Sequence, residues 1–256
     1  MTLVRILPPR LVSLAQGVEH GYQRFLDLLF PPVCPSCRQS VRAVHRLCRN
    51  CLDSLPPLPE NHCMRCGART ARPEPGCGAC LNNPHAMDAA YFAFPYDGRV
   101  AELILGFKFL DHPERSRLLA TLCWERLERA LYWEDPDLVV PMPLHFRRLL
   151  WRRYNQSALL AGEMGARLGK PLVTDLLIRH KRTRPQTRLN AHARRLNVQG
   201  AFSVIRPERL TGRSVLLVDD VFTTGATMQA AVVTLKRAGA RRVSGLCLAR
   251  VDADGP

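Results

Sequence analysis

One stretch, residues 213–229, constrains the fold of this chain more than any other. It reads Arg-Ser-Val-Leu-Leu-Val-Asp-Asp-Val-Phe-Thr-Thr-Gly-Ala-Thr-Met-Gln. The apolar run over 215–218 is typical of a buried parallel strand, and a helix is expected over about 226–238. Two carboxylates, Asp219 and Asp220, follow the apolar run. A strand, an acidic pair, a loop of small residues and a helix together predict an α/β fold with a ligand site at this turn.

The loop between the acidic pair and the helix has the chemistry of a phosphate site. The first turn of a helix offers backbone N–H groups and the positive end of the helix dipole, which favour a phosphate. Thr223, Thr224 and Thr227 add hydroxyl donors around Gly225. The two carboxylates are placed to hold sugar hydroxyls or a divalent cation. The alternative is an ordinary βα unit with an acidic turn, but the Thr-Thr-Gly-x-Thr order fits an anion cradle.

Eight of the ten cysteines form four C-x-x-C pairs in the N-terminal third of the chain. The third and fourth pairs repeat the first and second after 29 residues, so this region is an internal duplication. Each half supplies four thiolates, the number that a tetrahedral zinc ion needs. The sequence therefore predicts two structural zinc ions in tandem ribbons, one bound by Cys34, Cys37, Cys48 and Cys51 and the other by Cys63, Cys66, Cys77 and Cys80.

Three other uses of these cysteines are open. Disulfides are disfavoured because the chain reads as cytoplasmic, and an iron–sulfur cluster suits the even spacing less well than zinc. In a cross-braced arrangement, the first and third pairs would share one zinc ion. A short segment rich in Pro and Arg buries too little core alone, so bound metal would supply its folding free energy. Cys123 and Cys247 lie in apolar contexts and are expected to be ordinary buried thiols.

The charge of the chain points to polyanionic partners. The net charge is +15 and the pI is about 10.0, which favours phosphorylated metabolites or nucleic acid, although an Arg-rich proteome would also account for it. No run of about 18 apolar residues is present, so no membrane-spanning helix is expected. The N-terminus lacks the apolar core and cleavage site of a signal peptide. We therefore expect a cytoplasmic protein.

The sequence divides into three predicted parts. Residues 1–32 hold an amphipathic helix that ends at a Pro-Pro pair. This helix has little positive charge, so we expect it to pack on the protein's own core or on a second copy, as in a dimer, rather than on a membrane. Residues 33–84 hold the ribbons, and residues 89–251 hold the α/β domain. There we expect strands over 89–96, 138–140 and 242–251, and helices over 98–109, over 114–132 and up to about 168. Lys108, between two phenylalanines, could reach a ligand, but it is interpreted as a surface lysine.

Two further segments of the α/β domain are candidates for ligand contact. Residues 141–145, Pro-Met-Pro-Leu-His, form a rigid loop after a strand, where open α/β sheets bind ligands. A basic and aromatic segment follows. It would contact phosphates and stack on bases of a nucleic acid, or else begin a helix with aromatic core anchors. The candidate nucleic-acid contacts in it are Arg147, Arg148, Trp151, Arg152, Arg153 and Tyr154.

Residues 176–207 contain no acidic residue and are rich in arginine. The segment looks too polar to be core and too long to be a simple connector. Loops of this length are usually functional lids or disordered. A basic flap that closes over a pyrophosphate fits this composition, and a disordered basic loop is the alternative.

The motifs carry a family resemblance. The run Val-Leu-Leu-Val-Asp-Asp-Val-Phe-Thr-Thr-Gly-Ala-Thr resembles the phosphoribosyl pyrophosphate (PRPP) signature of type I phosphoribosyltransferases. From about residue 26 to residue 250 the chain resembles the ComF family, including its GntX-like members. That similarity includes the cysteine ribbons, Pro-Met-Pro-Leu-His before Arg-Arg-Tyr-Asn-Gln, and the run Arg-Arg-Leu-Asn-Val-Gln-Gly-Ala-Phe at 194–202. The resemblance implies a type I phosphoribosyltransferase fold, a mostly parallel sheet flanked by helices, after a double zinc ribbon.

The resemblance also implies a site. Asp219 and Asp220 would be the catalytic pair that holds the ribose hydroxyls, directly or through Mg²⁺. The residues implied to bind PRPP are Val221, Thr223, Thr224, Gly225, Ala226 and Thr227 around the 5′-phosphate, Pro143 and His145 at the pyrophosphate, and Arg194 and Arg195 on the flap. The chemistry would be displacement of pyrophosphate at C1′. Nothing in the chain identifies the acceptor, so a PRPP-binding protein without efficient transferase activity is also open.

The ComF family is linked to natural competence, in which imported single-stranded DNA is handled in the cytoplasm. The implied partners are therefore PRPP, single-stranded DNA and proteins of DNA uptake, such as helicases. A second hypothesis is a non-catalytic single-stranded-DNA-binding or scaffold factor that senses PRPP. In that hypothesis the ribbons and the basic segments carry the binding.

Overall fold

The structure is a computed structural model that describes residues 31–59, 61–72, 76–82, 86–109, 112–181, 198 and 200–251. The chain divides into two compact units, and the boundary in the sequence falls between Asp53 and Ser54. The helix predicted over 1–32 lies outside the described residues except for its last two positions. Among the described residues, no helix is both long and apolar enough to span a membrane.

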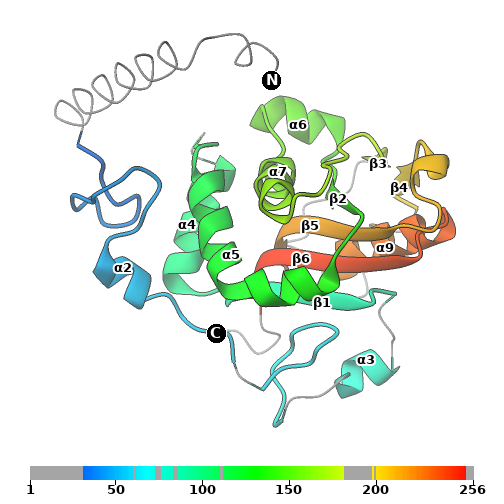
Figure 1. Cartoon of the computed structure of the whole chain (residues 1–256), viewed down its shortest axis with the longest axis horizontal. Helices are drawn as coiled ribbons and strands as arrows, with labels where there is room; N and C mark the ends of the chain where they lie inside the picture. Colours follow the sequence, from blue (N-terminus) through cyan, green and yellow to red (C-terminus); the bar gives the residue numbers. More distant parts are fainter. Residues whose placement is uncertain are drawn as a thin grey trace, which may run out of the picture. The chain divides into compact units, whose positions relative to one another are not determined.

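A four-stranded parallel sheet forms the centre of the second unit (Figure 1). Its order is β1 (Ala89–Pro95), β6 (Arg242–Arg250), β5 (Ser214–Phe222) and β2 (Leu138–Pro141). The first five residues of β5 and the last eight of β6 are buried, as expected for parallel strands with both faces covered. The predicted strands are confirmed, but β5 runs on through the acidic pair to Phe222, so both carboxylates belong to the strand.

Helices cover both faces of this sheet. Helices α5 (Arg115–Glu134) and α7 (Gln156–Leu168) pack on each other and on β1, β2 and β5, while α9 (Ala226–Arg237) packs on β5 and β6. Val215 and Leu217 join the core beneath α9. Because side chains alternate along a strand, the intervening residues of β5 face the opposite layer. The remaining elements are α4 (Gly98–Phe109), α6 (Phe146–Arg152), η3 (Pro207–Arg209) and, in the cysteine region, α2 (Arg49–Asp53) and α3 (Gly78–Asn82).

The two ends of the basic segment 176–207 form a small antiparallel ribbon. Strand β3 (Leu177–Arg179) pairs with β4 (Phe202–Val204), and β4 packs against α9. Leu176 and Leu177 are fully buried in the domain core. The prediction that the whole segment is too polar for the core is therefore wrong, because its apolar residues are concentrated at its two ends. Residues 182–197 and 199 lie outside the described residues, and closure of this flap stays a prediction.

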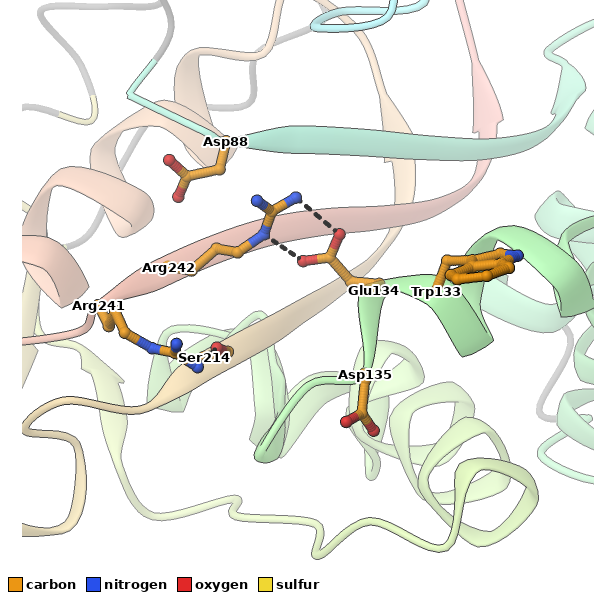
Figure 2. Close-up of a pocket in the computed structure, with 7 residues that line it drawn as sticks. All are labelled: Asp88, Trp133, Glu134, Asp135, Ser214, Arg241 and Arg242. Atoms are coloured by element: carbon orange, nitrogen blue, oxygen red, sulfur yellow. Dashed lines mark hydrogen bonds and ion pairs between the residues drawn. The ribbon is translucent and has the colours of Figure 1, made fainter.

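A buried carboxylate ties α5 to the amino ends of the strands (Figure 2). Glu134, the last residue of α5, accepts hydrogen bonds from Arg242 at 2.8 and 3.0 Å, from the Tyr91 hydroxyl at 2.6 Å and from the Ser244 hydroxyl. Burial alone would raise the pKa of Glu134, but the bonds from Arg242, Ser244 and Tyr91 outweigh burial and lower that pKa. The carboxylate is therefore charged at neutral pH, and it joins one helix to two strands.

We expect Glu134→Gln to lower the free energy of unfolding by about 2–3 kcal/mol. The side chain of Glu134 is only 2% exposed, so the variant leaves buried donors without their charged acceptor. Urea denaturation at pH 7 measures the difference. Glu128→Gln, an exposed position on the same helix, is the matched control and should change the free energy by less than about 0.5 kcal/mol. Equal effects of the two variants would contradict a structural role for this network.

Candidate functional site

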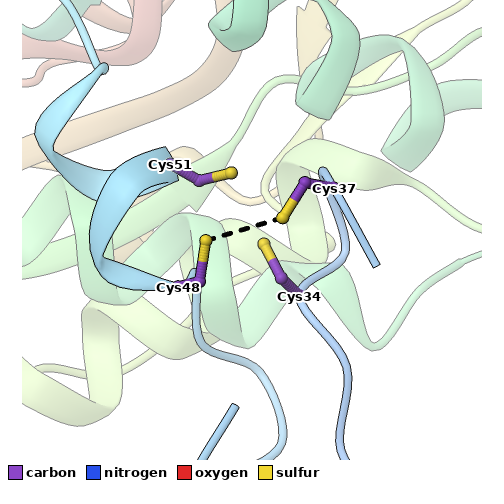
Figure 3. Close-up of side chains that lie close together, drawn as sticks. All are labelled: Cys34, Cys37, Cys48 and Cys51. Carbon is purple, nitrogen blue, oxygen red and sulfur yellow. Dashed lines mark hydrogen bonds between the residues drawn. The ribbon is translucent and has the colours of Figure 1, made fainter. Parts of the chain in front are cut away.

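The eight cysteines of the C-x-x-C pairs gather into two groups of four, and within each group the sulfur atoms all lie within 4.8 Å of one another. The first group, Cys34, Cys37, Cys48 and Cys51, belongs to the first unit (Figure 3). The second group, Cys63, Cys66, Cys77 and Cys80, belongs to the second unit. This grouping confirms the tandem prediction and contradicts the cross-braced alternative. All ten cysteines are free, which contradicts disulfides, and Cys123 and Cys247 are buried as predicted.

The duplication is visible in the backbone of the two ribbons. The amide of Cys34 donates to the carbonyl of Gln39 at 2.7 Å, and the amide of Cys63 donates to that of Ala68 at 2.8 Å. Helices α2 and α3 likewise begin 29 residues apart.

Burial raises the pKa of the Cys34 and Cys63 thiols, but hydrogen bonds from backbone amides outweigh it. The resulting pKa is about 6 for Cys34 and about 7 for Cys63. Burial raises the pKa of Cys51, Cys66 and Cys80, so a bound cation is needed for all four sulfur atoms of a group to ionise. Four sulfur atoms gathered in this way fit structural Zn²⁺.

At the opposite edge of the sheet from Glu134, the carboxyl end of β5 presents the acidic pair. Asp219 Oδ1 accepts hydrogen bonds from the Ser157 hydroxyl and from the Asp220 amide, both at 2.9 Å. Asp220 Oδ1 lies 2.9 Å from Lys108 Nζ. Both carboxylates line a cleft of about 400 Å³ at the ends of β5, β6 and β2. The pair is thus held by groups from α4 and α7, with room for a ligand beside it.

The two carboxylates are not equivalent electrostatically. Burial, together with the negative charge of Asp220, raises the pKa of Asp219 from 3.8 to about 7, although Lys108 and the Ser157 hydroxyl act in the other direction. A carboxyl group whose pKa is raised in the folded state binds its proton more tightly there than in the unfolded chain. Folding is therefore favoured below the folded pKa, and stability falls as the pH rises from about 4 through about 7.

We expect Asp219→Asn to stabilise the protein at pH 8 by about 2–4 kcal/mol and to change its stability little at pH 5. At pH 5 the native carboxyl is already protonated, so the amide replaces a neutral group, whereas at pH 8 it replaces a buried charge. Urea denaturation at the two pH values measures the difference. Asp97→Asn, at an exposed position, should show no such dependence on pH. A gain of equal size at both pH values would contradict the raised pKa.

The loop after β5, residues 223–227, is named here the phosphate loop. Gly225 precedes α9 with φ of 74°, and a Cβ there would lie 2.5 Å from the ring of Phe222. Both the backbone conformation and the close approach therefore require glycine. Thr223, Gly225 and Thr227 line the cleft, as does Val221 before them. Thr224 and Ala226 belong to the same turn but are not among the lining residues.

Lys108, in the C-terminal turn of α4, lies beside the cleft and not on the open surface that the sequence predicted. The carbonyl of Phe107 accepts a hydrogen bond of 2.5 Å from the Tyr154 hydroxyl, and the carbonyl of Lys108 accepts one of 3.4 Å from Gln156. These contacts fix the end of α4 beside the cleft, where the Lys108 side chain is only 17% exposed. The prediction of a surface lysine is wrong. The Tyr154 hydroxyl holds the end of α4, and contact of Tyr154 with nucleic acid stays a prediction.

Three arginines line the same cleft as the acidic pair. Arg148 and Arg152 come from α6 and Arg179 from β3. Burial lowers the pKa of Arg152 and of Arg179, and the positive charge of Arg148 lowers both further. Guanidinium groups that repel one another at close range are suited to an anion with several negative charges, which relieves the repulsion. The cleft thus combines two carboxylates, a lysine and an arginine cluster with a loop suited to phosphate.

The remaining predicted residues fall into three groups. Pro143 lines the cleft, whereas His145 caps α6, accepting from the Arg147 amide at 3.3 Å. Arg194 and Arg195 lie outside the described residues. Of the candidate nucleic-acid contacts, Arg148 and Arg152 line the cleft, whereas Arg147, Trp151 and Arg153 do not. Sequence reasoning did not select Ser157 and gave Arg179 only a place in the flap. The signal available for Ser157 was its position directly after the Asn-Gln that begins α7.

Comparisons with known proteins agree with this architecture. Residues 25–81 match the family described as the double zinc ribbon domain, and residues 154–255 match the phosphoribosyl transferase domain. Competence protein F of Haemophilus influenzae is 32% identical over 224 residues, which cover 85% of this chain and 96% of that protein. DNA utilization protein YhgH of Salmonella typhimurium is 30% identical over 227 residues, covering 87% of this chain and 99% of that protein. The predicted fold class, an α/β phosphoribosyltransferase domain with a zinc-ribbon module, is confirmed.

Among solved structures, a purine phosphoribosyltransferase from Pyrococcus horikoshii matches 56% of this chain and 74% of its own, with a TM-score of 0.33 and 17% identity. The glutamine PRPP amidotransferase from B. subtilis matches 54% of this chain and 26% of its own, with a TM-score of 0.34 and 20% identity.

Proposed function

The chain belongs to the ComF family, that of competence protein F and the DNA utilization protein YhgH, and on this premise we propose that it binds PRPP together with Mg²⁺ in the cleft at the end of β5. The observation that carries the proposal is the meeting, in one cleft, of the acidic pair, Lys108, the phosphate loop and the arginine cluster. A ribose with a phosphate at one end and a pyrophosphate at the other needs these groups in this combination. We also propose that the protein is a phosphoribosyltransferase of the cytoplasm.

Each part of PRPP has a proposed contact. The 5′-phosphate lies in the phosphate loop, where backbone amides and the hydroxyls of Thr223 and Thr227 donate to it. Asp219 and Asp220 accept from the ribose 2′- and 3′-hydroxyls. The pyrophosphate faces Arg148, Arg152 and Arg179, whose charges neutralise it as it leaves C1′. Catalysis by these residues consists of positioning the ribose and stabilising the leaving group, through an oxocarbenium-like state.

The carboxylate oxygens of Asp219 and Asp220 are hard ligands of the kind that Mg²⁺ prefers, so they fit the ion as it arrives with PRPP. Bound Mg²⁺ would neutralise charge on the pyrophosphate. Lys108 balances the charge of Asp220, one of the two carboxylates.

Two measurements test this function. Isothermal titration calorimetry with PRPP, with and without Mg²⁺, should show binding that depends on the ion. Release of pyrophosphate from PRPP is then followed with a set of acceptors that includes free bases, nucleotides and single-stranded DNA. Binding together with release in the presence of one acceptor supports a transferase. Binding without release under any acceptor favours the sensor alternative, and no binding at millimolar PRPP contradicts both.

The names of these two relatives refer to competence and to DNA utilization. We propose that this chain likewise acts in the handling of imported single-stranded DNA, with proteins of DNA uptake, such as helicases, as partners. The acceptor of the ribosyl group would then be DNA or a compound derived from it.

A second candidate function, binding of single-stranded DNA, is favoured by the outer face of α6. Phe146, Leu150 and Trp151 are 60%, 75% and 72% exposed, which is unusual for large apolar side chains on one short helix. The guanidinium of Arg147 lies 5.9 Å from the centre of the Phe146 ring. Exposed aromatic rings beside arginines are what base stacking and phosphate contact require. Of the predicted nucleic-acid contacts, Arg147, Trp151 and Arg153 do not line the cleft, and we propose that they contact the DNA.

The DNA-binding candidate is tested by fluorescence anisotropy of a labelled oligothymidine at several salt concentrations. Trp151→Ala is expected to weaken binding by about tenfold, the worth of one stacked base. Trp133→Ala is the matched control, because Trp133 is 90% exposed but lies at the opposite edge of the sheet, and it should leave the affinity unchanged. Equal effects of the two variants, or an affinity that does not depend on salt, would count against this function.

A further inference from the structure

The second zinc ribbon is joined to the sheet by a buried arginine. Arg250, the last residue of β6, is only 7% exposed and donates from Nε to the carbonyl of Cys66 at 2.5 Å. Its Nη1 donates to the carbonyl of Val251 at 3.2 Å. Cys66 is one of the four cysteines of the second group, and Val251 lines the cleft. One guanidinium group therefore contacts the backbone of a metal ligand and the backbone of a cleft residue.

Gly67, directly after Cys66, shows how close this approach is. A Cβ at Gly67 would lie 2.5 Å from the ring of Phe92 on β1 and 2.9 Å from Cδ of Arg250. The duplication provides an internal comparison, because Arg38 takes the same place in the first ribbon, 29 residues earlier. Arg38 has φ of 63° and Gly67 has φ of 68°, so this turn accepts a side chain. The glycine is therefore required by the contact with the sheet and not by the backbone conformation alone.

The same contacts continue to the phosphate loop. The rings of Phe92 and Phe222 pack edge to face with their centres 5.1 Å apart. Phe222 in turn fills the space above Gly225, where a Cβ would lie 2.5 Å from its ring. The carbonyl of Phe222 also accepts from the amide of Val251 at 2.8 Å. Two routes, one through Phe92 and one through Arg250, thus join the second ribbon to the residue that shapes the phosphate loop.

We propose that the second zinc ribbon positions the phosphate loop, with Gly67, Phe92 and Arg250 as the positioning residues. Zinc held by Cys63, Cys66, Cys77 and Cys80 fixes the Cys66 carbonyl and Gly67 against the sheet. Phe92 and Arg250 then hold Phe222, and Phe222 holds the turn at Gly225. The second ribbon is therefore part of the apparatus that recognises the 5′-phosphate. This inference rests on the proposed function, because it concerns the affinity of the same cleft.

The test is Gly67→Ala, with Arg38→Ala as the matched control at the duplicated position. Zinc content is measured first and should be two ions per chain in both variants. Calorimetry with PRPP and Mg²⁺ is then expected to show about tenfold weaker binding for Gly67→Ala, because the added methyl group displaces the Phe92 ring and, with it, Phe222. Arg38 is exposed, so Arg38→Ala should bind as the wild type does. Equal PRPP affinity of the two variants would overturn the proposal.

Binding of two different ligands distinguishes an effect on the phosphate loop from a loss of structure in the whole cleft. Ribose 5-phosphate depends on the phosphate loop, whereas pyrophosphate depends on the arginine cluster of the same cleft. The proposal requires Gly67→Ala to weaken ribose 5-phosphate binding and to leave pyrophosphate binding within about twofold of the wild type. Equal losses for both ligands would overturn a positioning role.

If Gly67→Ala does not fold, Arg250→Lys serves in its place. Lysine keeps the positive charge but cannot contact both carbonyls in the geometry of a guanidinium group. The same selective loss of ribose 5-phosphate binding is expected, and its absence would overturn the proposal. Failure of the wild-type protein to bind PRPP would instead contradict the proposed function, so the two failures are distinguishable.

Discussion

Replacing Asp219 and Asp220 together by asparagine is expected to weaken PRPP binding by at least about a hundredfold, because each hydrogen bond to a charged group contributes about 1.5–3 kcal/mol. The amides keep the size of the side chains but lose the charge that accepts from two ribose hydroxyls and attracts Mg²⁺. Calorimetry at pH 8 with Mg²⁺ measures the loss. Undiminished binding by the double variant would contradict the assignment of the site.

Two controls separate this loss from unfolding. The double variant should keep two zinc ions per chain, since the thiolate groups are remote from the acidic pair in the sequence and use no carboxylate. Asp175→Asn removes an exposed carboxylate that pairs with Arg206 and Arg209 and should leave PRPP affinity unchanged. Between the single variants, Asp220→Asn also frees Lys108 from its partner at 2.9 Å, so its effect should depend more strongly on salt than that of Asp219→Asn.

Removal of one thiolate from each ribbon is expected to abolish zinc binding altogether. Cys51→Ser and Cys80→Ser should each reduce the zinc content from two ions to one, and the double variant should hold none. The reason is that a ribbon this small depends on its metal for folding, with an apparent free energy of about 10–16 kcal/mol per site. Elemental analysis of the purified protein measures the content.

The double variant also discriminates between ligand arrangements. In a cross-braced module, Cys51 and Cys80 would bind the same ion, and the double variant would retain the other one. Loss of both ions is therefore specific to the tandem grouping. Cys123→Ala, at a buried thiol outside both groups, is the control and should retain two ions.

Features set by nearby residues could be predicted from the sequence. The 29-residue repeat predicts both thiolate groups, because each ribbon is made of contacts within about twenty residues. The apolar run before Asp219 predicts a buried parallel strand, since covered faces leave no polar positions. The predicted strand was shorter than β5, because a strand recognised by its apolar residues ends at the first charged one. In the structure, β5 continues through Asp219 and Asp220 to Phe222.

Features set by distant contacts could not be predicted in this way. Lys108 faces the acidic pair because Tyr154 and Gln156, far along the chain, hold the end of α4 in place. No local pattern carries that information. Arg148 and Arg152 were predicted as nucleic-acid contacts from their neighbours in sequence, and their place in the cleft beside the acidic pair depends on where the fold puts α6. The buried ends of the basic segment 176–207 were not predicted, because the composition of the whole segment is dominated by its charged residues. The short apolar stretches that form β3 and β4 do not stand out in such a count.

The arginine cluster has a consequence for the rate at which the cleft fills. Arg148, Arg152 and Arg179 converge from two elements on one concave surface, in a chain of net charge +15. Such a surface concentrates the electric field and draws anionic molecules toward it before contact. Capture of a multiply charged phosphate ester is then faster than random collision alone would give, and this acceleration fades as ions shorten the reach of the field to about 8 Å at physiological ionic strength. The arginines that we propose to hold the pyrophosphate thus also shorten the search for it.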